Sequence, residues 1–416
     1  MTGITIPELL EARAPGAWEL YRKEGASREI VRSGADRCES VRREAGLAAR
    51  WWDPASRFAA AGSEEDLARV LPEAAEAAAS PGEVPQWPSG AARIPEGGAA
   101  LDPPPDLFEE LARLVSAESR GEAALRHLSV RRGRSVERVV NAGGLDVAWA
   151  SEALTGFAEA VGRRGARACE ARALFRWEVQ PDLPGLARRL SDRATLPLCG
   201  RASPVDRGEW LLDVSVAAAL LAALAPLFAG DGHPPWAARG TLLPPEISIV
   251  DDATPDAPYD GEGTRSRRVV LVSGGALRAR LHDLASARRA GTASTGHGVR
   301  RSYRTPPARA ARRIFFETER PVPPRELLAS VRRGLFASAL TGPLFCDLEN
   351  DRYEARFTGV AVTAGRAQGP VAAARVRGRL SELLRRVAAL CPDPGFFPMP
   401  DPVGGATLLV ERVSFE

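Results

Sequence analysis

The sequence predicts an α+β protein, in which an N-terminal α/β unit is followed by a largely antiparallel, curved-sheet C-terminal domain. In the first 82 residues, apolar strand-like segments precede a helical segment. That segment begins with Ser63 and three acidic residues, a pattern typical of a capped helix N-terminus. In residues 206–416, apolar strands alternate with turns that contain Gly and Pro, as around 353–362, and helical segments are few. Such a composition favours antiparallel pairing.

The chain has 416 residues, more than one hydrophobic core usually organises, so several domains are expected. Residues 83–105 are too rich in Pro and Gly for a helix or a central strand and are predicted to form a linker. The predicted organisation is an N-terminal α/β domain at 1–82, the linker at 83–105, a middle domain at 106–205 and a sheet-rich C-terminal domain at 206–416.

Local patterns predict the individual elements before residue 206. Helices are expected where Leu recurs at helical spacing, and strands where apolar residues alternate. In chain order, the predictions are a helix at 7–12, a pair of strands within 18–31, a strand at 46–52, a helix at 63–79, a helix at 106–117, alternating segments within 123–148 and a helix at 186–193.

In the C-terminal part, an apolar run of about 17 residues at 214–230 falls short of the ~20 needed to span a bilayer. Because Pro226 also interrupts it, a buried core helix is predicted. The remaining expected elements are a strand at 247–250, a turn at 251–264, a strand at 269–272 with a Gly274-Gly275 hairpin, a helix through Leu277, Leu281, Leu284 and Ala285, a loop at 292–296 and a strand at 353–362.

Composition and charge limit the classes of partner. The net charge is only +3, so bulk charge indicates neither a nucleic-acid nor a membrane partner. The chain has five scattered cysteines and no C-x-x-C pair, a pattern typical of reduced thiols. The first residues lack a basic start and an apolar core, so no secretory signal is expected and a cytoplasmic location is predicted.

Three ordered blocks resemble the TldD/TldE (PmbA) family. The first combines a D-x-E-G-T turn with an A-x-x-x-G…S-T-G loop, and its residues are Asp260, Gly261, Glu262, Gly263, Thr264, Ala287, Gly291, Ser294, Thr295 and Gly296. The second, at 326–335, resembles the family's E-x-x-x-S-V-x-x-G-L helix. The third, at 403–411, resembles its closing V-G-x-P-T-L-L-I-E strand, with Ala406 in place of Pro. The resemblance implies a structural role for the motif residues.

Catalytic members of that family are zinc peptidases that carry His-Glu-x-x-x-His on a helix and a distant Cys. This chain has four histidines, at 127, 233, 282 and 297, and no two are close enough to share a helix face. The segment where the motif would lie, 217–222, contains only Ala and Leu, and 394–407 contains no Cys, although Cys391 lies slightly earlier. We therefore expect no catalytic residue and no metal ligand set here.

The resemblance then implies a TldE-like subunit that is zinc-free and forms a heterodimer with a TldD-like partner, in which zinc is expected. Such pairs process peptides or peptide-like precursors, including those of specialised metabolites. Two other classes stay open. One is a stand-alone or homodimeric binding protein for an anionic peptide or small molecule, and the other is a zinc-independent hydrolase that uses His297 or Cys346.

Weaker site hypotheses accompany these. A dispersed metal site could combine Asp231, His233 and Cys391. The acidic turn formed by Asp251, Asp252, Asp256, Asp260 and Glu262 could bind a hard cation, although a solvated turn with local hydrogen bonds is the simpler interpretation. Next to His297, no carboxylate lies at a spacing that would indicate a nucleophilic triad.

Residues 265–313 contain 13 arginines and a single acid, Asp283. One interpretation is a solvated basic face. The other is a surface for an anionic group, because Arg binds carboxylates bidentately. The predicted substrate-binding residues are His297, Arg300, Arg301, Tyr303 and Arg304. Aromatic residues are too sparse among these arginines to indicate nucleic-acid binding.

Overall fold

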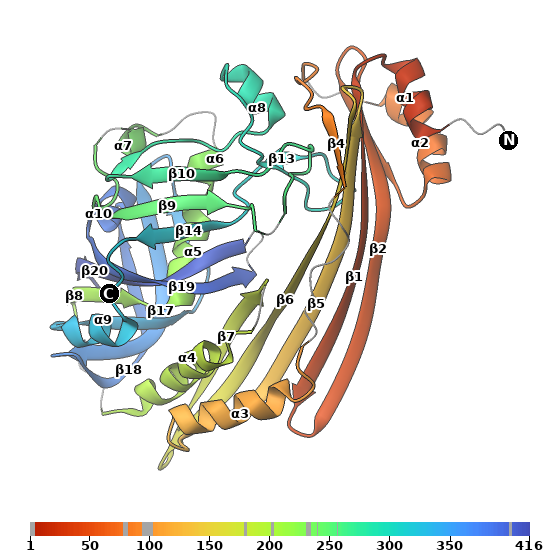
Figure 1. Ribbon diagram of the computed structural model, residues 1–416. Coiled ribbons are helices and arrows are strands. Elements are labelled where there is room, and N and C mark those ends of the chain that lie inside the picture. The colour runs from red at the N-terminus through yellow and green to blue at the C-terminus, as the bar shows by residue number, and fades with distance from the viewer. Residues whose placement is uncertain are drawn as a thin grey trace.

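The structure, a computed structural model, describes residues 5–77, 82–93, 103–178, 181–200, 204–229, 234–238, 240–255, 257–398 and 402–416. A long, bent antiparallel sheet built from the first half of the chain stands beside a more compact sheet built from the second half (Figure 1). The predicted α+β class is confirmed.

Strands β1 (Trp18–Ser33) and β2 (Asp36–Trp52) form one long hairpin, in which 18–33 pair in continuous register with 36–51. The prediction of two strands within 18–31 is therefore wrong, because the segment is a single strand. Gly25 has an ordinary strand conformation, whereas Gly34 has a φ of 59° and makes the turn. The strand predicted at 46–52 is the end of β2.

The bent sheet has the order β3-β2-β1-β5-β6-β7, with antiparallel neighbours throughout. Figure 1 shows that its longest strands, β1, β2, β5 and β6, bend strongly along their length. The further strands are β3 (Ser56–Ala61), β5 (Ala123–Asn141), β6 (Leu145–Arg164) and β7 (Arg167–Trp177). Because β1 pairs with β5, parts of the predicted N-terminal and middle domains share one sheet. The domain boundaries themselves stay a prediction.

Within the predicted linker, β4 (Gly90–Arg93) pairs with the start of β6, while 94–102 lie outside the described residues. Helices α1 (Ile6–Arg13) and α2 (Glu64–Glu76) cover one end of the bent sheet, and α3 (Leu107–Glu118) and α4 (Leu183–Thr195) the other (Figure 1). The predicted cap of α2 is confirmed, because the Ser63 hydroxyl accepts from the Asp66 N–H at 3.1 Å.

The second sheet contains most of the remaining strands, and their pairing is largely antiparallel. Its strands are β8 (Arg207–Leu212), β9 (Ile247–Asp252), β10 (Arg268–Ser273), β11 (Ala276–Leu277), β14 (Ile314–Thr318), β15 (Arg333–Leu340), β16 (Phe345–Asp347), β17 (Arg352–Thr363), β18 (Arg366–Gly378), β19 (Val387–Pro398) and β20 (Pro402–Ser414). The pairs β8–β15 and β14–β20 are parallel. One residue pair, Phe396 with Arg176, joins this sheet to the bent one.

Helix α5 (Val214–Leu224) is buried in the largest core cluster and packs against β20. The predicted core helix is confirmed, and its break at Pro226 starts the short α6 (Pro226–Ala229). The other short elements are a 3₁₀ turn (Leu196–Leu198), α7 (Pro235–Ala238), α8 (Leu284–Arg289), β12 (Gly298–Val299), β13 (Ala308–Arg309), α9 (Pro324–Ser330) and α10 (Leu380–Arg385). In the described part of the chain, no helix is long and apolar enough to cross a membrane.

Two helix predictions are wrong in their extent. Leu277 belongs to β11, and α8 begins only at Leu284, because the Asp283 side chain caps it by accepting from the Ser286 N–H at 2.7 Å. The helix predicted at 326–335 ends at Ser330. Gly334 lies instead in β15, where a Cβ would approach the Glu209 carbonyl oxygen to 2.0 Å.

Candidate functional site

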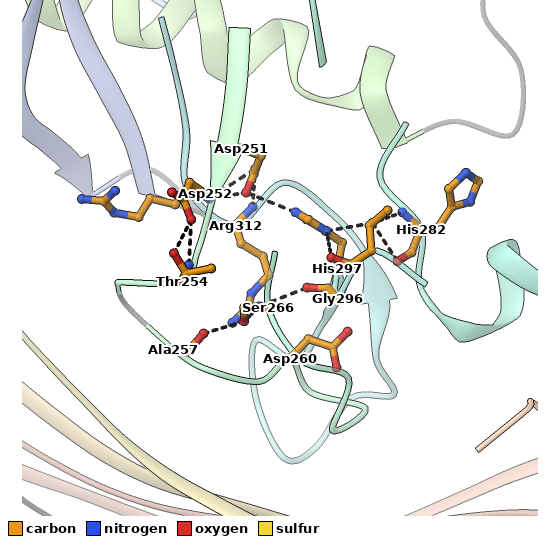
Figure 2. Close-up of polar contacts among 12 residues, drawn as sticks. Asp251, Asp252, Thr254, Ala257, Asp260, Ser266, His282, Gly296, His297 and Arg312 are labelled. Carbon is orange, nitrogen blue, oxygen red and sulfur yellow. Dashed lines mark hydrogen bonds and ion pairs between the residues drawn. The ribbon is translucent and has the colours of Figure 1, made fainter. Parts of the chain in front are cut away.

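The motif residues at 260–264 and 294–296 lie in loops between β9 and β14, and the structure brings them together (Figure 2). The buried Asp260 carboxylate accepts from the Glu262 N–H at 2.9 Å and the Thr264 N–H at 2.8 Å, which closes its own turn. Its second oxygen accepts from the Gly298 N–H at 2.8 Å. Asp260 therefore fastens the turn to the chain that follows Ser294-Thr295-Gly296.

A second network surrounds His297, which is 0% exposed. Its Nε2 lies 3.1 Å from Asp251 Oδ1, and its Nδ1 lies 2.9 Å from the Thr295 hydroxyl (Figure 2). The other Asp251 oxygen accepts from the Arg312 N–H at 2.9 Å. The Asp251 carboxylate, which sequence spacing did not identify as a partner of His297, thus contacts the imidazole ring. Both side chains are buried.

Four charged side chains join these loops to the bent sheet, and we call them the interlock: Glu19, Arg50, Glu262 and Arg300. Arg50 of β2 donates to Glu262 at 2.8 Å and to Glu19 of β1 at 3.1 Å. Arg300 donates to Glu19 and, through Nε, to the Gly261 carbonyl oxygen at 2.7 Å. The interlock is buried and therefore holds two remote parts of the chain in one arrangement.

The interlock has a defined electrostatic balance. Burial raises the pKa of Glu262 to about 7; Arg50 opposes this shift, and the Asp260 and Glu19 carboxylates add to it. Burial lowers the pKa of Arg300, against the effect of Glu19. The second Glu262 oxygen accepts from the Leu284 N–H at 2.8 Å, at the start of α8. Two carboxylates and two guanidinium groups thus face one another in a network whose residues are at most 8% exposed.

The five predicted substrate-binding residues separate into two groups. His297, Arg300 and Tyr303 are buried, and the Tyr303 ring occupies the space that a Cβ at Gly46 of β2 would need. Arg301 and Arg304 are exposed, and Arg304 Nε donates to the Tyr303 hydroxyl at 3.0 Å. A role of these residues in binding substrate stays a prediction. Cys346, the other nucleophile considered, has its thiol pKa raised to about 12 by burial, which disfavours the reactive thiolate.

In the described part of the chain, two cavities large enough for a ligand lie outside the motif loops. One, of about 560 Å³, lies where α4, β8, α9 and β19 meet, and its walls include Arg189, Leu196, Leu211, Val214, Phe336 and Cys391. The other, of about 530 Å³, lies on the bent sheet, and its walls include Lys23, Gly25, Ser27, Arg42, Gly133 and Ser135. Sequence analysis missed both, because their walls come from residues far apart in the chain.

The described residues near the first cavity do not fit a zinc ion. Helix α5 carries only apolar side chains and Ser215, and Asp213 is occupied by capping the Ser215 N–H at 3.0 Å and by its ion pair with Arg193. Across the described ranges no three His, Cys, Asp or Glu side chains are grouped to hold a metal. Asp231 and His233 of the dispersed site, and Asp256 of the acidic turn, lie outside those ranges.

Comparisons with known proteins agree with this fold. The structure is similar to that of TldE from Thermococcus kodakarensis, with a TM-score of 0.82 and 18% identity, covering 99% of both chains. It is also similar to a Thermotoga maritima protein described as a candidate modulator of a DNA gyrase, with a TM-score of 0.78 and 15% identity, again covering 99% of both chains. At these identities the similarity establishes the fold.

Sequence comparison identifies the C-terminal part more specifically. An uncharacterised protein of Methanocaldococcus jannaschii is 42% identical over 66 residues, a match that spans 15% of this chain and 16% of that protein. Residues 210–416 match the PmbA/TldA metallopeptidase C-terminal domain. They contain all three sequence blocks, from the D-x-E-G-T turn to the closing strand. The chain therefore belongs to the TldD/TldE (PmbA) family.

Proposed function

We propose that this chain is the zinc-free, non-catalytic subunit of a heterodimeric TldD/TldE-type metallopeptidase, whose TldD-like partner carries the zinc. The observation that supports this most directly is helix α5. It occupies the place where the family resemblance puts His-Glu-x-x-x-His, and it offers Ala217, Ala218 and Leu221, all buried. Without imidazole or carboxylate groups on that helix, the Lewis acid of the reaction has to come from another subunit.

The part that we assign to this chain rests on its buried interlock and its exposed arginines. The interlock fixes the motif loops against β1 and β2, so the loops present a defined surface. Arg301 and Arg304 are exposed directly after the buried Arg300. We propose that the chain closes the partner's reaction chamber and that these guanidinium groups bind carboxylates of a peptide or peptide-like substrate.

The test is co-expression with a TldD-type protein that carries His-Glu-x-x-x-His. The complex is measured by size exclusion with light scattering, and peptide cleavage is measured for each subunit alone and for the mixture. We expect activity only from the mixture, and its loss on chelation with recovery on adding zinc. A matched control uses a partner whose motif Glu is replaced by Gln, which should assemble normally but not cleave.

Two results would count against this proposal. Full cleavage by the partner alone would show that this chain contributes nothing to the reaction. One tightly held zinc ion per isolated chain, together with cleavage by that chain, would contradict the zinc-free assignment.

A second candidate is a stand-alone binding protein for an anionic peptide or small molecule. The 530 Å³ cavity on the bent sheet favours it, because Lys23 and Arg42 stand at a floor of small residues such as Gly25 and Gly133. It predicts that an acidic peptide binds the isolated chain, and that the affinity falls as salt screens the contacts. Unchanged affinity in Lys23→Ala and Arg42→Ala variants would contradict this candidate.

A further inference from the structure

The first ten residues of β2, 36–45, form a long open sheet edge. Along one side β2 pairs with β1 throughout, but on the other side it pairs with β3 only from Leu47 to Trp52. Within the described parts of the chain, no strand covers the outer side of 36–46. Every residue from 36 to 45 is exposed, whereas the seven that follow are buried.

This edge lacks two devices that usually protect open edges. Its register with β1 is continuous, without a bulge, and residues 36–45 contain no Pro. Ten strand residues present an edge of roughly 33 Å. A long, regular edge of this kind is a template for another strand. In Figure 1 it lies on the side of the bent sheet that faces away from the second sheet.

The turn determines which residues offer backbone groups outward. Gly34 and Ala35 form a two-residue turn, so the flanking pair Ser33–Asp36 exchanges hydrogen bonds with each other. In an antiparallel ladder the direction alternates, and every second residue after Asp36 therefore points its N–H and C=O outward. The outward set is Arg37, Glu39, Val41, Arg43 and Ala45.

The side chains of this set carry a self-complementary pattern. Val41 is 60% exposed, one of two large hydrophobic side chains that are exposed among the described residues. Glu39 and Arg43 lie two positions to either side of it. Arg28 of β1 holds the Glu39 carboxylate at 2.6 Å, which orients it while leaving oxygen lone pairs for another donor.

We propose that a second copy of this chain pairs antiparallel with this edge, about a two-fold axis through Val41. In that register the two Val41 side chains meet, and each Glu39 lies opposite the Arg43 of the other copy. Moving the axis by two residues places Glu39 against Glu39 or Arg43 against Arg43, which like charge disfavours. The edge charges therefore select one register and repel others.

This interface goes beyond the proposed function, because it links two copies of the same chain and does not involve the TldD-like partner. The test measures the mass of the purified chain by sedimentation over a concentration series, for wild type, Glu39→Arg and Arg43→Glu. We expect wild type to approach twice 44.4 kDa. Each single variant should weaken the dimer by about tenfold or more, because two attractive pairs become repulsive.

The most direct test of the register is to mix the Glu39→Arg and Arg43→Glu variants. Arg at 39 and Arg at 43 of one variant would then face Glu at 43 and Glu at 39 of the other, so a mixed dimer should form at concentrations where each variant alone is monomeric. The matched control is Glu170→Arg, a charge reversal at an exposed residue of β7, the strand at the opposite edge of the bent sheet, which should leave the dimer unchanged. Circular dichroism of each variant monitors folding.

Three outcomes would overturn the proposal. They are a wild-type chain that stays monomeric at high concentration, a dimer that both single variants retain, and single variants that stay monomeric when mixed although both are folded. If a TldD-like partner instead dissociates the wild-type dimer and binds in a way that Glu39→Arg abolishes, the edge belongs to the heterodimer and the second copy is not its occupant.

Discussion

The Arg50 guanidinium of β2 donates to the Glu262 carboxylate at 2.8 Å, although the two residues are 212 positions apart. This ion pair connects the bent sheet to the D-x-E-G-T turn. Glu19 accepts hydrogen bonds from both Arg50 and Arg300. The Arg50–Glu262 ion pair therefore belongs to a four-residue network. The motif turn is therefore held by side chains that lie far outside the motif.

Arg50→Ala should destabilise the protein by about 3–5 kcal/mol, because it leaves the buried Glu19 and Glu262 carboxylates with one cation fewer. Urea unfolding followed by tryptophan fluorescence measures the free energy of unfolding. Arg69→Ala, which removes an exposed arginine of α2, is the control and should change it by less than about 0.5 kcal/mol. Equal effects of the two variants would show that the interlock does not stabilise the fold.

Glu262 should make the protein more stable in mild acid. Its pKa is raised to about 7 in the folded state from an ordinary value of 4.5, so between these pH values the folded chain binds more protons than the unfolded chain. The free energy of unfolding should therefore fall as pH rises from 5 to 8, by up to about 3 kcal/mol from this group. Glu262→Gln should flatten that slope, and Glu24→Gln, at an exposed position, should not. An unchanged slope in Glu262→Gln would contradict the assignment.

The sequence predicted the motif turn but not what holds it. Asp260 and Thr264 lie four residues apart, and their contact follows from local turn chemistry. Glu19 and Arg50 carry no comparable signal, because their partner Glu262 is remote and a lone Glu or Arg in a strand is usually exposed. Two strands were predicted within 18–31, but the turn lies at Gly34, because composition alone does not show which glycine adopts a positive φ.

Gly263→Ala should destabilise the protein more than Gly291→Ala, although both glycines belong to the family motif and both have positive φ, 76° and 63°. A Cβ at Gly263 would approach the buried Leu145 side chain to 2.2 Å, whereas a Cβ at Gly291 meets nothing within 4 Å. Gly291→Ala thus measures the backbone cost alone, about 1–2 kcal/mol. Thermal unfolding of both variants, and of Gly263→Ala with Leu145→Ala, separates the contact from the backbone cost. Equal losses of stability in Gly263→Ala and Gly291→Ala would contradict a role for the contact with Leu145.

Arg301→Ala and Arg304→Ala should raise the KM of the assembled peptidase for an acidic peptide without lowering the stability of this chain, because both side chains are exposed. We expect a rise of about tenfold for each charge-assisted contact that is lost, with kcat nearly unchanged, since binding is weakened equally in the ground and transition states. Arg300→Ala is the matched contrast, because it removes a buried cation of the interlock. Unlike the two exposed-arginine variants, it should lower the free energy of unfolding. Steady-state kinetics on acidic and neutral peptides of the same length measures the effect. If KM for the acidic peptide is the same in wild type and both exposed-arginine variants, these arginines do not bind substrate.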